Sequence, residues 1–227
     1  MPRVVPKGWK GPRDVRKVRS NETFLGKGFH GHVETGRVTF KNGKTRRVAI
    51  KRFVYPPSTD KVNEYRRMIR TLHRAGVNVA KIGFVKIPTR EKPKGEWVQI
   101  TPLYGNAKGT RLLSFFDRNL TWDHKKNILM EACKLARAGV WFSIDCFHVT
   151  PQGQIVVIDI DNLVLSKKSA KEEKIPREIQ NWRIMKEIID TIHSMGDHTS
   201  QRNELMDIAR NNLPPQLNRF LPKEKRE

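Results

Sequence analysis

Three glycines near the start of the chain have the spacing of a phosphate-binding loop. Gly26, Gly28 and Gly31, followed by Val33, fit the pattern G-x-G-x-x-G-x-V. Residues typical of β-strands flank this stretch on both sides, which predicts a hairpin whose backbone N–H groups face phosphate oxygens. A dinucleotide-binding fold would need a helix after the glycines, so that interpretation is disfavoured. The same glycines would also suit an ordinary turn.

A lysine in a later predicted strand is the next residue that could contact a phosphate. Val48-Ala49-Ile50-Lys51 ends twenty residues beyond Gly31 and lies in a second predicted strand. A lysine in an apolar strand is costly unless its ammonium meets an anion or water. Lys51 therefore either faces a phosphate or lies at a solvated sheet edge.

Taken together, these motifs resemble the protein kinase superfamily, and the resemblance covers about residues 23–195. It implies ATP bound between two lobes, with Lys51 on the α- and β-phosphates and Glu64 of the next helix paired with Lys51. The cofactor-binding residues that it implies are Gly26, Gly28, Gly31, Val33, Ala49, Lys51, Glu64 and Asp159.

Two carboxylates follow an aliphatic strand in the second half. Asp159 comes directly after Ile155–Ile158, and Asp161 is two residues further on. The resemblance implies that Asp159 binds Mg²⁺ and that Asp161 adds a second carboxylate, although the family's D-F-G reads Asp-Ile-Asp here. The alternative is that Asp159 caps a turn.

The catalytic loop of the family is the least well matched part. Ser143-Ile144-Asp145 is the nearest counterpart of H-R-D, and Thr150 stands where an asparagine is expected. The resemblance implies Asp145 as the base that accepts the proton of the substrate hydroxyl; an ordinary turn carboxylate is the alternative. Cys146 and His148 could also form a nucleophilic pair, but the sequence offers no orienting acid.

Composition limits the class of protein. The chain has 227 residues, of which 37% are hydrophobic, and a formal net charge of +22. These values predict a soluble globular protein, and with no membrane span or signal peptide we expect it in the cytoplasm. The two cysteines are expected to be reduced thiols. The charge predicts polyanionic partners without choosing among them.

The element pattern predicts an α+β, bilobal, protein-kinase-like fold. Its N-lobe is a small antiparallel sheet with one helix, and its C-lobe is short and mostly helical. We expect a basic flexible arm over 1–20, the N-lobe over 21–103, the C-lobe over 104–222 and a charged tail over 223–227. The individual elements are expected as strands within 23–54, around 80–87 and 96–102, a hairpin about 151–153, and helices at 59–75, 110–119, 121–139, 176–194 and 200–211.

The sequence thus favours a kinase-like phosphotransferase that moves the γ-phosphoryl group of Mg-ATP to a hydroxyl, by default of a protein Ser or Thr. One alternative is a pseudokinase scaffold that binds nucleotide or an acidic partner without efficient transfer. A further alternative is a nucleic-acid-binding module that contacts RNA or DNA through the basic N-terminal arm.

Overall fold

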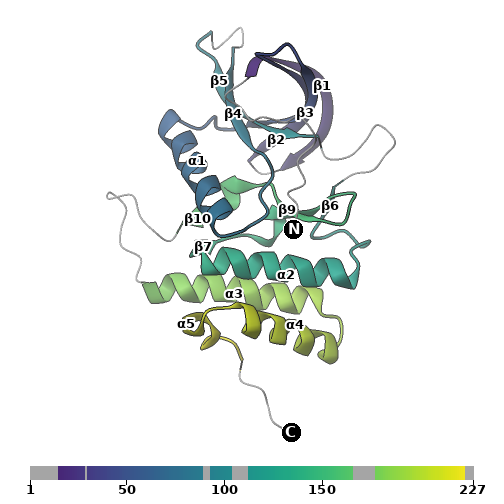
Figure 1. Ribbon diagram of the computed structural model, residues 1–227, viewed down its shortest axis with the longest axis vertical. Helices are drawn as coiled ribbons and strands as arrows, with labels where there is room; N and C mark the ends of the chain where they lie inside the picture. Colours follow the sequence, from purple (N-terminus) through teal and green to yellow (C-terminus); the bar gives the residue numbers. More distant parts are fainter. Residues whose placement is uncertain (1–14, 29, 89–92, 104–111, 166–176, 223–227) are drawn as a thin grey trace. The chain divides into compact units, whose positions relative to one another are not determined.

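The chain is an α+β protein that divides into two compact units (Figure 1). This computed structural model describes residues 15–28, 30–88, 93–103, 112–165 and 177–222. The first unit contains residues 1–67 and 79–111, and the second contains 68–78 and 112–227. In the described residues, no helix is both long enough and apolar enough to cross a membrane.

A five-stranded antiparallel sheet with the order β1-β2-β3-β5-β4 forms the first unit. Its strands are β1 (Val15–Gly28), β2 (Gly31–Phe40), β3 (Thr45–Phe53), β4 (Gly83–Ile87) and β5 (Glu96–Pro102). The predicted strands are confirmed, and a short turn joins β2 to β3. There Gly43 adopts φ 78°, and the backbone N–H of Lys44 donates to Asn42 Oδ1 at 3.1 Å.

One face of the sheet is the core of this unit. Alternate residues of each strand point to the same face of the sheet. On this face five aliphatic side chains are fully buried: Val38, Val48, Ile50, Val98 and Ile100. Burying such aliphatic side chains supplies about 1.5–3 kcal/mol each.

The expected flexible arm over 1–20 is wrong from Val15 onward. Val15 and Val18 pack against the core cluster, and Val18 lies opposite Val38 in the β1–β2 register. The two valines are three residues apart, and a register shift between Val15 and Lys17 lets both pack against the same core. Residues 1–14 lie outside the described part.

The predicted helix after β3 is confirmed as α1 (Thr59–Arg74). It packs on the sheet of the first unit: the ring of Tyr65 stacks on Phe84 at 5.5 Å, and Trp97 Nε1 donates to Thr59 Oγ1 at 3.4 Å. Gly76, with φ 73°, ends the helix in the left-handed conformation that glycine adopts without strain.

Helices dominate the second unit. They are α2 (Trp122–Arg137), α3 (Arg177–Met195), α4 (Thr199–Asn212) and the short α5 (Pro215–Asn218), which the sequence did not predict. Thr121 caps α2, and its side-chain oxygen accepts the backbone N–H of His124 at 3.2 Å. Short strands complete the unit: β6 (Leu113–Ser114), β7 (Val140–Trp141), β8 (Phe147–Val149), β9 (Ile155–Val157) and β10 (Val164–Leu165).

Asn78, in the segment after α1, makes three hydrogen bonds within the second unit. The backbone N–H of Asn78 donates to Glu131 Oε2 at 3.0 Å, and its side chain donates to the carbonyl of Ile155. The carbonyl of Asn78 accepts the backbone N–H of Val157 at 2.9 Å. Asn78 thus ties this segment to both α2 and β9.

The helix expected over 110–119 is wrong in its described part. Leu113 pairs with Val149 of β8, and a turn follows in which Asp117 Oδ1 accepts the backbone N–H of Asn119 at 3.0 Å. This aspartate turn satisfies backbone groups that a helix would otherwise use. Residues 110–111 of that predicted helix and the charged tail expected over 223–227 lie outside the described residues.

Arg52 joins two carboxylates at one end of the sheet. Its Nε donates to Glu34 Oε1 at 2.8 Å and its guanidinium donates to Glu96 Oε1 at 3.4 Å. The side chains of Arg52 and Glu34 are only 20% and 9% exposed, so water does little to solvate them. Removing Arg52 would leave the Glu34 charge buried without a counter-ion.

We therefore expect Arg52→Met to lower the free energy of unfolding by about 2–3 kcal/mol, measured by urea titration. Arg46→Met on the same strand, at an exposed position, is the control and should cost less than about 0.5 kcal/mol. Adding Glu34→Gln to Arg52→Met should restore part of the loss. Equal effects of the two arginine variants would contradict this account.

Gly31 and Gly26 give a second matched pair. A Cβ on Gly31 would lie 2.0 Å from the backbone oxygen of Arg52, whereas a Cβ on Gly26 meets nothing within 4 Å. We expect Gly31→Ala to cost about 2 kcal/mol or more and Gly26→Ala less than about 0.5 kcal/mol. Thermal unfolding of both variants tests this difference, and an unchanged melting temperature for Gly31→Ala would refute it.

Candidate functional site

The register of β2 and β3 places the predicted lysine among predicted nucleotide-contacting residues. Val33 lies directly opposite Lys51, and Thr35 lies opposite Ala49. Val48 and Ile50 point into the core, so the alternate residues Ala49 and Lys51 point to the other face. We call Val33, Thr35, Ala49, Lys51, Gln99 and Thr101 the lysine face.

Two buried polar residues of this face were not predicted as site residues. Gln99 and Thr101 of β5 lie opposite Lys51 and Ala49 and are almost fully buried. The Gln99 side-chain oxygen makes no hydrogen bond in the described part of the chain. Polar residues that alternate with Val98 and Ile100 in an apolar strand are the sequence signal that could have identified this face.

The glycine-rich stretch forms the turn of the β1–β2 hairpin, as predicted. Gly26 lies opposite Val33, and Gly28 lies opposite Gly31. The His30 carbonyl accepts the backbone N–H of Val54 at 3.0 Å, so the turn is fastened to the end of β3. Gly31 needs its small size for this close approach whether or not a phosphate binds, and Gly26 leaves open space where a side chain would otherwise project.

Glu64 is not paired with Lys51 in the way that the resemblance implies. Its carboxylate accepts a hydrogen bond from Lys61 Nζ at 2.9 Å, and both side chains are 47% exposed. The inward positions of α1 belong instead to neighbours such as Tyr65 and Met68, which leaves Glu64 on the solvated side of the helix.

In the second unit, strand pairing brings together the two segments that carry the predicted carboxylates. β7 pairs with β10, and β8 pairs with β9. The connection from β7 to β8 and the connection from β9 to β10 must therefore run side by side. Asp145 lies in the first connection and Asp159 in the second, within short 3₁₀ turns or at their start.

A backbone hydrogen bond and a thiol confirm that these segments are adjacent. Ile158 donates its N–H to the carbonyl of Cys146 at 3.1 Å. Burial raises the pKa of the Cys146 thiol well above its ordinary value, and the nearby charges of Asp145 and Asp159 raise that pKa further. Both carboxylates are therefore close enough to Cys146 to act on one buried group.

Glu187 of α3 joins this group, and the sequence did not predict it. Burial raises the pKa of Glu187, and the negative charges of Asp190 and Asp145 raise it further, while a hydrogen bond from Trp141 opposes the rise. We call Asp145, Asp159 and Glu187 the acidic cluster. A single glutamate on an amphipathic helix carries no sequence signal of such a role, because only folding brings α3 to β7.

The predicted metal ligands suit a cation that takes most of its ligands from elsewhere. Asp159 and Asp161 stand at the start of and within the second 3₁₀ turn. Across the described residues, no three His, Cys, Asp or Glu side chains gather into a metal site. Mg²⁺ is commonly held by one or two carboxylates together with water and phosphate oxygens, so these two residues fit a nucleotide-bound Mg²⁺.

Thr150 cannot replace the asparagine that the kinase pattern has. It lies at the other end of the β8–β9 hairpin from Asp145 and closes the turn there: its hydroxyl accepts the N–H of Gln154 at 3.2 Å, and its own N–H donates to the carbonyl of the same residue at 2.8 Å. The family's second amide ligand therefore has no counterpart at this position.

The nucleophilic pair of Cys146 and His148 is also disfavoured. The Cys146 side chain is fully buried, and its raised pKa keeps the thiol protonated at neutral pH. A protonated, inaccessible thiol is a poor nucleophile. Cys133 is likewise buried, and burial raises its pKa to about 12. Both cysteines are free thiols, as predicted.

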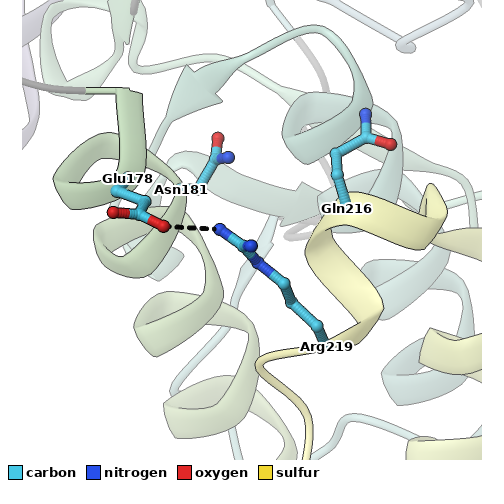
Figure 2. A pocket seen from close by; sticks show the side chains of 4 residues that line it. All are labelled: Glu178, Asn181, Gln216 and Arg219. Atoms are coloured by element: carbon cyan, nitrogen blue, oxygen red, sulfur yellow. Dashed lines mark hydrogen bonds and ion pairs between the residues drawn. The ribbon is translucent and has the colours of Figure 1, made fainter.

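A surface pocket in the second unit contains none of the predicted residues. Figure 2 shows its lining, which comes from α3 and from α5 and the residue after it: Glu178, Asn181, Gln216 and Arg219. The Arg219 guanidinium donates to Glu178 at 3.0 Å, and both side chains are more than half exposed. An exposed pair of this kind contributes little binding energy, so the candidate residues remain the lysine face of the first unit and, separately, the acidic cluster of the second unit.

Comparison with known proteins adds no family assignment. A scan against protein-family models finds no match to this chain, and a search of curated proteins finds no similar sequence.

The raised pKa of Glu187 predicts how stability depends on pH. Because the folded state favours protonated Glu187, this group stabilises the fold fully below the ordinary glutamate pKa, and that stability is lost as the pH rises through the raised pKa. Glu187→Gln keeps an acceptor for Trp141 but cannot ionise. The variant should therefore unfold at a higher temperature than the wild type at neutral pH, and the difference should vanish at a pH of about 4.

The control is Glu178→Gln on the same helix, where the carboxylate is exposed. It should show no gain in melting temperature at neutral pH. A Glu187→Gln variant that is less stable than the wild type across the whole range would contradict the predicted sign.

Proposed function

We propose that the chain is a bilobal, kinase-like phosphotransferase that moves the γ-phosphoryl group of Mg-ATP to a hydroxyl, with a protein Ser or Thr as the default acceptor. The observation that carries the proposal is the pairing of Val33 with Lys51 beside the glycine turn. Residues selected from two separate motifs share one face of one sheet. β3 lies between β2 and β5, so Lys51 is not the lysine of a sheet edge.

In this proposal the first unit holds the nucleotide. Backbone N–H groups of the glycine turn face the phosphates, and Lys51 supplies a positive charge to the α- and β-phosphates. Val33 and Ala49 offer a small apolar surface beside Lys51, on which a base or ribose can pack. Glu64 has no part in orienting Lys51, because it is paired with Lys61.

The second unit supplies the carboxylates. Asp159, with Asp161, would hold Mg²⁺, which neutralises charge on the phosphate oxygens when bound. Asp145 would accept the proton of the attacking hydroxyl and orient its oxygen. Support for these roles comes from the hairpin that brings Asp145 and Asp159 to the same end, a convergence that a simple turn carboxylate would not need.

A pseudokinase scaffold is the second candidate, and a specific observation favours it. Thr150 closes the far turn of the hairpin, so no amide stands in for the missing asparagine there. A chain with this loop could bind Mg-ATP and a partner without efficient transfer.

Binding and transfer should be measured separately. Lys51→Met should weaken Mg-ATP binding by about tenfold or more in isothermal titration, because it removes the positive charge beside the phosphates. Asp159→Asn should weaken binding to a similar extent, because it removes a carboxylate that would hold Mg²⁺. Asp145→Asn should retain binding but lower phosphoryl transfer to a degenerate Ser/Thr peptide library by about 10²–10⁴-fold. Asp197→Asn, at a well-exposed carboxylate, and Lys186→Met, on the surface of α3, are the matched controls and should change neither quantity.

The possible outcomes separate the candidates. Transfer that is unchanged in Asp145→Asn would show that the base assignment is wrong. A wild-type chain that binds Mg-ATP but transfers phosphate to no acceptor would support the scaffold. If the wild type does not bind Mg-ATP, both nucleotide-based functions are excluded.

A further inference from the structure

Three arginines form a row across the first three strands of the sheet. Arg19 of β1 lies directly opposite Arg37 of β2, and Arg37 lies directly opposite Arg47 of β3. All three side chains are exposed. Adjacent strands are about 4.8 Å apart, so the row spans about 10 Å. We call these residues the arginine row.

Like charges placed directly opposite one another destabilise a sheet. In the described parts of the chain, none of these three arginines forms an ion pair with a carboxylate. Elsewhere the chain neutralises such charges: Arg52 has two carboxylate partners in the same sheet, and Lys61 has one on α1. Among the residues that the structure describes, no ion pair with a carboxylate therefore offsets the repulsion within the arginine row.

The surroundings of the row add to its positive charge. Segments 15–20 and 36–49 together contain no Asp or Glu and have eight basic residues, all exposed: Arg16, Lys17, Arg19, Arg37, Lys41, Lys44, Arg46 and Arg47. The exposed large hydrophobic residues of the described chain all lie outside these two segments. The surface thus offers many donors for phosphate groups and no aromatic platform for stacking bases.

We propose that the arginine row is a docking surface for double-stranded RNA. Guanidinium groups bind phosphate oxygens through paired, charge-assisted hydrogen bonds. A duplex presents its phosphates on the outside, whereas single strands are usually held by stacking of their bases on aromatic side chains, which this surface lacks. The narrow major groove of A-form RNA brings phosphates of the two strands closer together than B-form DNA does, which suits three cations within about 10 Å.

This surface is separate from the lysine face and does not depend on the proposed phosphotransfer. Arg47 and Lys51 are four residues apart on β3, which corresponds to about 13 Å along the strand. It also differs from the arm predicted to contact nucleic acid, because the arginine row belongs to the sheet itself.

The test uses the full chain and a 20-base-pair RNA duplex of mixed sequence, with binding followed by fluorescence anisotropy from 50 to 200 mM KCl. The triple variant Arg19→Gln/Arg37→Gln/Arg47→Gln should bind the duplex at least about tenfold more weakly than the wild type. The slope of log K against log salt should become shallower by about two to three, because up to three phosphate contacts no longer release counterions. Circular dichroism and the melting temperature verify that the variant is folded.

The matched control is Arg67→Gln/Arg70→Gln/Arg74→Gln on α1, which removes the same number of exposed arginines and the same net charge. It should change the affinity by less than about threefold, and equal losses in the two triple variants would refute the arginine row as the specific surface. A DNA duplex of the same sequence and the single RNA strand should bind more weakly than the RNA duplex. Binding of either at equal or higher affinity, or no binding of the RNA duplex by the wild type, would overturn the proposal.

Discussion

The antiparallel register of β2 and β3 is the constraint on which the first unit depends. It runs without interruption from Gly31 opposite Phe53 to Thr39 opposite Thr45. A slip of one residue would exchange the two faces of a strand and move Lys51 into the aliphatic core. The register is held at one end by Gly31, whose missing side chain lets the strand lie against the backbone of Arg52. At the same end, the ion pairs of Arg52 with Glu34 and Glu96 link three strands.

This register serves two separate surfaces. On the side away from the core, it places Val33 and Ala49 beside Lys51, and it also aligns Arg37 with Arg47 further along the strands. The first is the surface proposed for a nucleotide, and the second is the surface proposed for a larger polyanion. The basic residues of this sheet differ in their surroundings. Arg52 is paired with carboxylates and partly buried, whereas the arginine row is exposed and has no carboxylate partners among the described residues.

The second unit depends on a different constraint, the nested pairing of β7 with β10 and of β8 with β9. This pairing makes the β7–β8 connection and the β9–β10 connection neighbours. Asp145 lies in the first connection and Asp159 in the second. Asn78 supports this arrangement by binding β9 and α2 at once. The buried Cys146 beneath the carboxylates has a structural role, because its thiol is fully buried and stays protonated.

Local patterns in the sequence determined the strands, the longer helices, the glycine hairpin and the turn at Gly43, because each of these follows from spacing and turn chemistry within a few residues. They also identified Lys51, Asp145 and Asp159 as candidates. They failed where a distant partner decides the outcome. Val15 and Val18 became part of a strand because a core was available to cover them, and Leu113 joined a sheet because β8 offered an edge. Glu64 forms an ion pair with Lys61, because other residues of α1 occupy the inward positions of the helix. Tertiary structure alone brought Glu187 to Asp145 and set three arginines in one row, because both arrangements join residues whose proximity depends on pairing and packing between separate elements.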